Sequence, residues 1–229
     1  AEGPAQLASA RWASKEPTAR SGRTASKGWS EVCAEAGSWP LCPGLVVSQP
    51  GGATLAVLAL QPGFQRRPET VEVRRTDGSR EVMARAVASR DGTDVVVESS
   101  LRMPVVLLRL QRGPGLEGTG VAVLKATPSF GGLRDGAPPL CTIRAGGAGE
   151  GFVAWHGTAA DRAVLLALRL HGGDGGPANV VDGEGRLLSA VESLSGDAGQ
   201  SLQLLHVAQG VDSTLVIAAV VAAQMLRDA

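Results

Sequence analysis

An all-β fold with a single C-terminal helix is predicted by three features of the sequence. Short runs rich in Val, Leu and Ala recur along most of the chain. Turn-forming residues separate these runs, since the chain holds 31 Gly and 13 Pro. The last stretch, VDSTLVIAAVVAAQMLRDA (211–229), is instead continuously apolar after its first residues. Short strands with this spacing are typical of an antiparallel sandwich or barrel rather than of βαβ units.

The order of the runs predicts two six-stranded antiparallel β-barrels, with the boundary near the loop QRGPGLEG (111–118). Asp-Gly in TDGSR (76–80) supplies the positive-φ positions of a hairpin turn, and DGEG (182–185) predicts another. The expected strands are 43–48, 53–60, 69–75, 80–89, 94–99, 104–110, 120–126, 139–145, 151–157, 163–170, 178–182, 186–193 and 202–208.

The two ends of the chain differ from this pattern. Residues 211–229 predict a helix packed on the barrels, with Asp212 or Ser213 as its N-cap. Residues 1–28 are rich in Ala, Ser, Arg and Lys with little apolar periodicity, which predicts an extended basic arm. The alternative is the remnant of an organelle-targeting segment, mitochondrial or chloroplast. The expected domains are therefore the arm 1–28, a first barrel 29–117, a second barrel 118–210 and the helix 211–229.

Composition argues against two classes of partner. The 22 Lys and Arg balance the 22 Asp and Glu, so no net field favours nucleic acid or an anionic membrane. Aromatic residues make up 3% with no Tyr, which removes the usual stacking platform for single-stranded nucleic acid. The longest apolar run, 215–226, is shorter than the roughly 20 residues that cross a bilayer, so no membrane span is expected.

The three cysteines leave the redox state open. Cys33 and Cys42 are close enough in sequence to form a disulfide across a hairpin, with Cys141 as a free thiol. Three buried thiols fit the count equally well. No CxxC pair suggests zinc, so neither a metal nor a cofactor is expected.

Several segments, taken in order, carry a likeness to a known family. They are GLVVSQPGGATLAVLAL (44–60), VEVRRTDGSREVMARAVASRDGTDVVV (71–97), GLEGTGVAVLKATPSFGG (115–132), CTIRAGG (141–147) and GGDGGPANVVDGEGRLLSAV (172–191). Together they resemble the trypsin-like serine proteases of the HtrA/Deg type, without the PDZ domain that many of these carry. The resemblance spans roughly residues 43 to 226.

The resemblance implies that the protease triad has decayed. The catalytic aspartate of the family falls on Asp94, whereas the histidine falls on Ala59 and the nucleophilic serine on Asp174. Acyl transfer needs a hydroxyl and an imidazole, and removing either one costs on the order of 10⁶ in kcat in subtilisin. The resemblance therefore implies a pseudoprotease, not an active enzyme.

The former oxyanion turn has a structural interpretation. Asp174 is expected to place its own carboxylate where the oxyanion would lie, which is favoured over a new catalytic carboxylate. The histidines His156, His171 and His206 are expected to close local hydrogen bonds rather than to bind metal or catalyse. The turn comprises Gly172, Gly173, Asp174, Gly175, Gly176 and Pro177.

The expected function is a non-catalytic structural, scaffold or assembly subunit of a larger complex. Its contacts with other protein subunits would use the N-terminal arm and the barrel surface, in a homo- or hetero-oligomer. The alternatives are a regulatory partner of an active Deg/HtrA-type protease, a peptide-binding module, or a serine hydrolase with a rearranged site. That hydrolase would use Ser129 or Ser189, with His171 as base.

Overall fold

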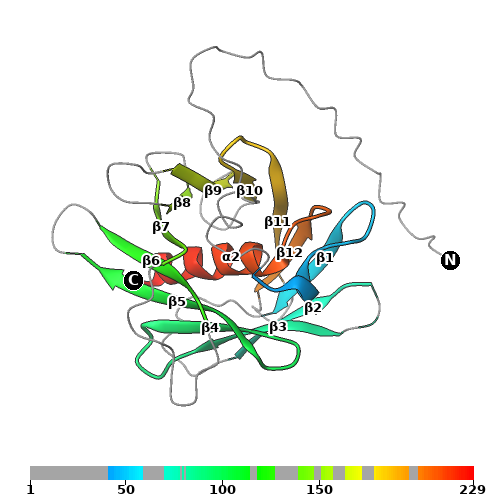
Figure 1. Ribbon diagram of the computed structural model, residues 1–229, viewed down its shortest axis with the longest axis horizontal. Helices are drawn as coiled ribbons and strands as arrows, with labels where there is room; N and C mark the ends of the chain where they lie inside the picture. Colours follow the sequence, from blue (N-terminus) through cyan, green and yellow to red (C-terminus); the bar gives the residue numbers. More distant parts are fainter. Residues whose placement is uncertain are drawn as a thin grey trace, which may run out of the picture.

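Twelve antiparallel strands form one closed barrel in the computed structural model of the chain, and a helix runs through its middle (Figure 1). Each strand pairs with its neighbours along the chain, and β1 pairs with β12 to close the ring. The structure describes residues 41–58, 70–77, 79, 81–113, 118–126, 139–146, 151–156, 163–171, 178–195 and 201–229.

The predicted strands are confirmed, apart from the first. Where a strand was expected at 43–48, the chain forms a short 3₁₀ helix, η1 (Pro43–Leu45), because Pro43 begins a tight turn there. The strands are β1 (Ala53–Leu58), β2 (Thr70–Arg75), β3 (Val82–Ala88), β4 (Asp94–Ser99), β5 (Pro104–Arg112), β6 (Thr119–Lys125), β7 (Cys141–Ala145), β8 (Phe152–His156), β9 (Ala163–Leu170), β10 (Ala178–Asp182), β11 (Leu187–Ser195) and β12 (Ser201–Val207). The helix is α2 (Ser213–Asp228).

The expected pair of six-stranded barrels is not what the structure shows. The strands on either side of the expected boundary, β5 and β6, are paired neighbours from Val106↔Lys125 to Arg112↔Thr119. The sheet then continues through β7 to β12 without a break and closes on β1. Hairpin pairing of consecutive strands is common to both arrangements, and only the closure between the two ends of the chain distinguishes them.

Helix α2 lies inside the barrel, whereas the sequence predicts a helix packed on the outside of two barrels (Figure 1). Every residue from Ser213 to Met225 is buried, which requires neighbours on all sides of the helix. An eight-stranded barrel is just filled by its own side chains, so a twelve-stranded one needs further material in its interior. The helix supplies that material and contacts β5, β6, β7 and β12.

Small inward-facing residues make room for this helix. On β3 the inward positions are Ala84, Ala86 and Ala88, all buried. Helix α2 itself presents Ala218, Ala219, Ala222 and Ala223, also buried, among larger Leu, Ile and Val side chains. Small side chains on β3 and on the helix reduce the volume that side chains occupy in the interior, which leaves space for α2.

The segment from Leu41 to Val47 forms hydrogen bonds with the residues at the start of α2. Asp212 is the N-cap, as predicted, and its carboxylate accepts hydrogen bonds from the backbone N–H of Thr214 (2.9 Å) and of Cys42 (3.1 Å). The backbone N–H of Val47 donates to Val211 (3.0 Å), and that of Gly210 donates to Val47 (2.7 Å). One buried carboxylate therefore connects two segments far apart in the sequence.

We expect Ile217→Ala to lower the free energy of unfolding by about 2–4 kcal/mol, because it opens a cavity between the helix and the strands. Ile217 is fully buried, whereas Leu101, at the turn between β4 and β5, is 82% exposed. Leu101→Ala is the matched control and should change the free energy by less than about 0.5 kcal/mol. Chemical denaturation measures both. Equal effects from the two substitutions would contradict a helix enclosed by the barrel.

Candidate functional site

Most positions of the expected triad and its oxyanion turn lie outside the described residues. These positions are Ala59, Gly172, Gly173, Asp174, Gly175, Gly176 and Pro177. The expected arm 1–28 and Cys33 also lie outside them. The structure therefore places one of the three triad positions, Asp94.

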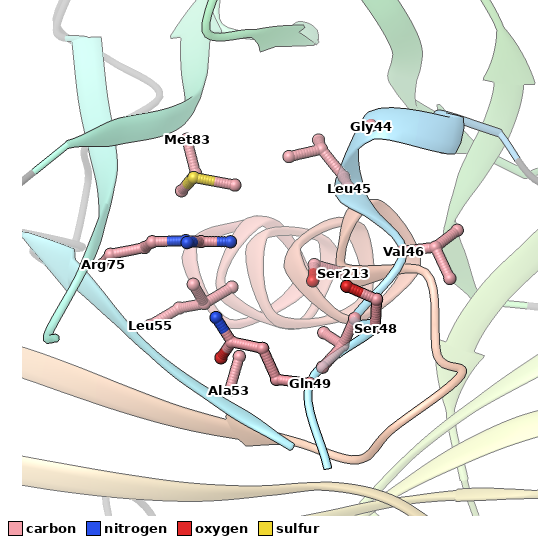
Figure 2. Close-up of a pocket in the computed structure, with 11 residues that line it drawn as sticks. Gly44, Leu45, Val46, Ser48, Gln49, Ala53, Leu55, Arg75, Met83 and Ser213 are labelled. Carbon is pink, nitrogen blue, oxygen red and sulfur yellow. The ribbon is translucent and has the colours of Figure 1, made fainter. Parts of the chain in front are cut away.

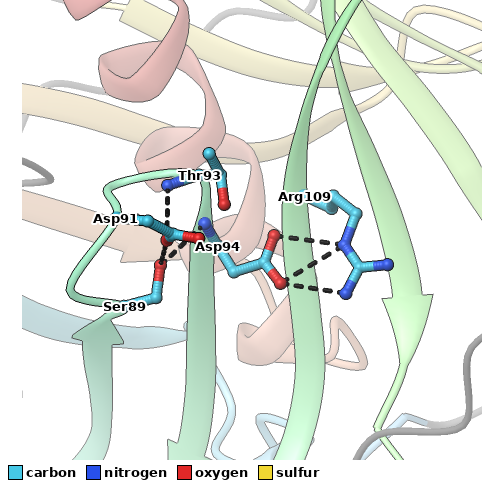
Figure 3. Close-up of polar contacts among 5 residues, drawn as sticks. All are labelled: Ser89, Asp91, Thr93, Asp94 and Arg109. Carbon is cyan, nitrogen blue, oxygen red and sulfur yellow. Dashed lines mark hydrogen bonds and ion pairs between the residues drawn. The ribbon is translucent and has the colours of Figure 1, made fainter.

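Asp94 forms an ion pair with Arg109 on the neighbouring strand (Figure 3). The two residues are directly opposite each other in the β4–β5 register. Arg109 Nε lies 3.1 Å from Asp94 Oδ1, and Arg109 Nη2 lies 3.0 Å from Oδ2. This two-pronged geometry occupies both carboxylate oxygens and holds the two strands together. Asp94 thus has a structural role at the beginning of β4.

The turn before Asp94 is organised by a second carboxylate. Asp91 accepts hydrogen bonds from the Ser89 hydroxyl and from the backbone N–H of Thr93, and Ser89 Oγ accepts the backbone N–H of Asp94 (Figure 3). The Ser89 hydroxyl, followed by the Thr93 backbone, holds the pKa of Asp91 below its usual value. The network stiffens a surface turn, and the Asp91 carboxylate is occupied by donors of that turn.

A groove of about 440 Å³ lies on the outer face of β11, β12 and β1. Its volume is within the range of ligand pockets, roughly 300–1,000 Å³. Residues alternate between the two faces of each strand, so buried Leu55 and Leu205 point to the helix while Thr54 and His206 point outward. The groove is lined by Gly51, Gly52, Ala53, Thr54, Leu187, Leu188, Ala190, Glu192, His206, Val207 and Ala208.

Three polar side chains from three adjacent strands meet in this groove. Thr54 is directly opposite His206 in the β1–β12 register, and its Oγ1 lies 3.1 Å from His206 Nδ1. Glu192 Oε2 lies 3.5 Å from His206 Nε2. The ring is 41% exposed, but its Nε2 atom is enclosed and makes no hydrogen bond to the described residues. The result is a hydroxyl–imidazole–carboxylate series in a largely aliphatic groove.

A tight turn forms one end of the groove. Gly51 and Gly52 have φ of 87° and 89°, in the left-handed region that favours glycine. A Cβ atom at Gly52 would lie 2.4 Å from the backbone oxygen of Val207, so the turn crosses β12 at a distance that excludes a side chain. The backbone N–H of Gly52 donates to Gln49 (3.1 Å), which closes the turn.

His171 and Ser189, also considered for catalysis, do not line this groove. His171 Nε2 lies 3.0 Å from the side-chain nitrogen of Asn179, consistent with a local contact. Ser189 is fully buried, and its hydroxyl donates to the backbone oxygen of Ala190 (3.3 Å). Ser129 and the side chain of His156 lie outside the described residues.

Cys42 is a free thiol at the edge of the core, and Cys141 is buried on β7. Burial and, to a smaller extent, the negative charge of Asp212 raise the pKa of the Cys42 thiol. Within the described ranges, no group of three or more His, Cys, Asp or Glu side chains could hold a metal ion. The same part of the chain contains no helix with the length and apolar content needed to cross a membrane.

The sequence predicts a local hydrogen bond for His206 but does not predict the groove. The outward positions of Thr54, His206 and Glu192 follow from the alternation within each strand. Their meeting depends on the pairing of β1 with β12, and these strands lie at opposite ends of the barrel sequence. The alternation along each strand predicts whether a side chain faces the interior or the outside of the barrel. It does not predict which residues of other strands lie beside it.

Comparison with known proteins supports the fold. No protein-family model matches the chain, and no curated protein matches it either. The chain is similar to a protein from Arabidopsis thaliana of known crystal structure, with a TM-score of 0.50 and 16% sequence identity. The similarity covers 78% of this chain and 95% of the Arabidopsis chain. At this level of identity, the likeness concerns the fold alone.

Proposed function

We propose that the chain is a non-catalytic scaffold or assembly subunit that holds a segment of a partner protein in the groove on β11, β12 and β1. The observation that carries this proposal is the groove itself, about 440 Å³ in volume and lined mainly by aliphatic and small residues. The resemblance to HtrA/Deg-type proteases stays a prediction. The proposal does not depend on it, because one closed barrel has no cleft between two barrels.

Closure of the barrel determines how a partner can bind. An open sheet offers an edge strand whose backbone groups can pair with a peptide, whereas a closed barrel has no such edge. Recognition at this face must therefore use outward side chains. Leu187 is 44% exposed in the groove, and Leu194 on the same strand is 45% exposed. Apolar side chains of a partner would gain most from covering these leucines.

The polar residues define a second requirement for the partner. Glu192 is exposed, with 56% of its side chain accessible, and forms the acidic end of the series that includes His206 and Thr54. A Lys or Arg next to the partner's apolar residues would pair with this carboxylate and fix the orientation of the segment. The proposal thus specifies an apolar segment with an adjacent basic residue.

Site-specific photo-crosslinking tests the proposal on the protein purified from its source organism. A photoreactive residue at Ala190, in the groove, should attach to one partner chain, whereas the same residue at Leu101 should not. Leu187→Asp should lower recovery of that partner at least tenfold, because it places a charge on the apolar wall. Leu101→Asp is the matched control and should leave recovery unchanged. Equal crosslinking from both positions, or full recovery with Leu187→Asp, would contradict the proposal.

A second candidate function rests on the order of the polar groups in the groove. In the tautomer in which Thr54 donates to His206 Nδ1, the Nε2 proton faces Glu192. Attack by Thr54 Oγ1 on an ester carbonyl would pass its proton to Nδ1, and His206 would then protonate the leaving alkoxide. Water would hydrolyse the acyl-threonine and restore the hydroxyl. This arrangement describes a hydrolase with a threonine nucleophile.

Active-site labelling separates the second candidate from the first. Under the hydrolase hypothesis, a fluorophosphonate probe modifies Thr54, and both Thr54→Val and His206→Gln abolish the modification. Under the scaffold proposal, the probe leaves Thr54 unmodified, and peptide mapping by mass spectrometry shows this directly. Thr54→Ser is the positive control, because it keeps the hydroxyl beside His206. Modification of Thr54 that persists in His206→Gln would count against the hydrolase.

A further inference from the structure

Two hollows in the described part of the barrel, besides the groove, are too small to admit a side chain. One lies where α2 begins, between residues 44–49 and the strands β1 and β2 (Figure 2). The other lies beside Val220, Ala223 and Arg227 of the helix. Each has a volume of about 20 Å³, and a single water needs about 10–15 Å³ on the same scale. The groove on β11, β12 and β1, at about 440 Å³, has room for a side chain of a partner.

The charge of this groove depends on two of its residues. Among the described residues that line it, Glu192 and His206 can ionise, whereas the others are Thr54, glycines and aliphatic residues. With Glu192 ionised, the groove carries one negative charge when His206 is neutral and no net charge when His206 is protonated. A proton on His206 therefore changes the charge that the groove presents to a partner.

The imidazole of His206 lies between a hydroxyl and a carboxylate. Its Nδ1 atom lies 3.1 Å from Thr54 Oγ1, and its Nε2 atom lies 3.5 Å from Glu192 Oε2. Nε2 is enclosed and makes no hydrogen bond within the described part of the chain, so a proton on this atom faces the Glu192 carboxylate. The carboxylate favours the neutral tautomer with its proton on Nε2, because the lone pair of the other tautomer would face a negative charge. Thr54 then donates its hydroxyl proton to Nδ1.

Protonation of His206 changes its interactions with both neighbours. The imidazolium carries a proton on each nitrogen, so Nδ1 donates to Thr54 Oγ1 instead of accepting from it. The positive ring also compensates the negative charge of Glu192. When His206 is neutral, the Glu192 carboxylate is open to a cation from outside, since 56% of the side chain is exposed. A proton on His206 and a basic side chain of a partner therefore compete for the same carboxylate.

The elements packed against β12 place no other charge beside His206 in the described part of the chain. Glu192 is the charged residue of β11, and β1 has none. The charged residues of α2, Arg227 and Asp228, lie at the far end of the helix inside the ring. The charged side chains that flank the groove on β2 and on the turn after β10 form ion pairs, which are Arg74–Glu72 and Arg186–Asp182. Glu192 is therefore the charge to which His206 responds.

We propose that protonation of His206 releases a basic partner segment from the groove. This regulation rests on the proposed scaffold function, in which a Lys or Arg of the partner pairs with Glu192. The partner cation meets one negative charge when His206 is neutral and no net charge when it is protonated. An ion pair at an exposed site changes affinity by about threefold to fivefold. Histidine is the side chain whose charge ordinarily changes between about pH 5 and pH 8, so acidification weakens binding.

A short peptide tests the proposal on the full chain. Acetyl-Leu-Lys-Leu-amide supplies two apolar side chains and one cation, and the control peptide carries Nε-acetyl-lysine, which has no charge. Each is titrated at pH 7.5 and at pH 5.5, and shifts of the Ala190 and Glu192 amides in ¹H–¹⁵N spectra give the dissociation constants. We expect the lysine peptide to bind about threefold to fivefold more weakly at pH 5.5, and the control peptide to bind equally at both. Equal binding of the lysine peptide at the two pH values, or its failure to bind at pH 7.5, would overturn the proposal.

Variants assign the pH dependence to His206. His206→Gln keeps a polar side chain beside Thr54 but cannot be protonated, so it should bind the lysine peptide equally at the two pH values. His171→Gln is the matched control and should keep the full pH dependence, because His171 contacts Asn179 and is not among the residues lining the groove. Persistence of the pH dependence in His206→Gln would contradict a role for His206. Thermal unfolding of each variant at both pH values shows whether the barrel is intact.

The regulation and the scaffold function fail in different experiments. Crosslinking from Ala190 at pH 7.5 reports whether a partner occupies the groove, and the comparison of the two pH values reports the regulation. A partner that crosslinks from Ala190, together with peptide binding that does not depend on pH, would leave the scaffold function standing and refute the regulation. Absence of any crosslinked partner would contradict the scaffold function, on which the regulation depends.

Discussion

The burial of α2 within a closed sheet is the constraint on which the rest of the structure depends. A twelve-stranded ring is too wide for its own side chains to fill, and a helix satisfies its own backbone hydrogen bonds when it is removed from water. The helix must then be apolar on every side, which it is from Leu215 to Ala223. The strands must leave room for it, which the alanines of β3 do. The apolar sequence of α2 and the small residues of β3 are therefore both requirements of the enclosed helix.

The same constraint determines where the barrel can interact with other molecules. Closure pairs the strand backbones with one another, so the outer face binds through side chains, as in the groove that contains Thr54 and His206. Helix α2 begins at one end of the barrel, and the backbone N–H groups of its first turn lie there. There Asp212 caps the helix on one side, and Arg75 and Ser213 face a separate hollow. The two hollows share only one lining residue, Ala53.

Much of the fold could be predicted from the sequence because its information is local. Strand positions follow from alternating apolar residues and from Gly, Pro and Asp at the turns, and the Asp212 cap follows from its place before an apolar run. The two-barrel prediction failed because β5 and β6 pair as a hairpin in either arrangement. Pairing between β1 and β12 leaves no local signal. Helix α2 is apolar on all of its faces, and this is a local indication that it is enclosed. A helix packed on the surface of a barrel would be apolar on one face alone.

The candidate site was less predictable than the fold for the same reason. Glu192 and His206 lie on β11 and β12, which pair as consecutive strands, but Thr54 on β1 comes beside them only when the ring closes. Asp94 was predicted as the surviving member of a decayed triad, but in the structure it pairs with Arg109, directly opposite on the next strand. A carboxylate at a strand end facing an arginine is a structural feature that a family resemblance does not reveal. A site that forms only when β1 pairs with β12 can be found from the structure but not from the sequence alone.

Native-state amide hydrogen exchange tests the central claim, that α2 is the core of the barrel, most directly. If the barrel encloses the helix, the amides of residues 216–223 can exchange only when the barrel opens. The free energy of exchange for these amides should then equal that of the most protected strand residues, such as Val106 and Leu108 on β5. Exchange of the helix at a clearly lower free energy, with the strands still protected, would contradict the account.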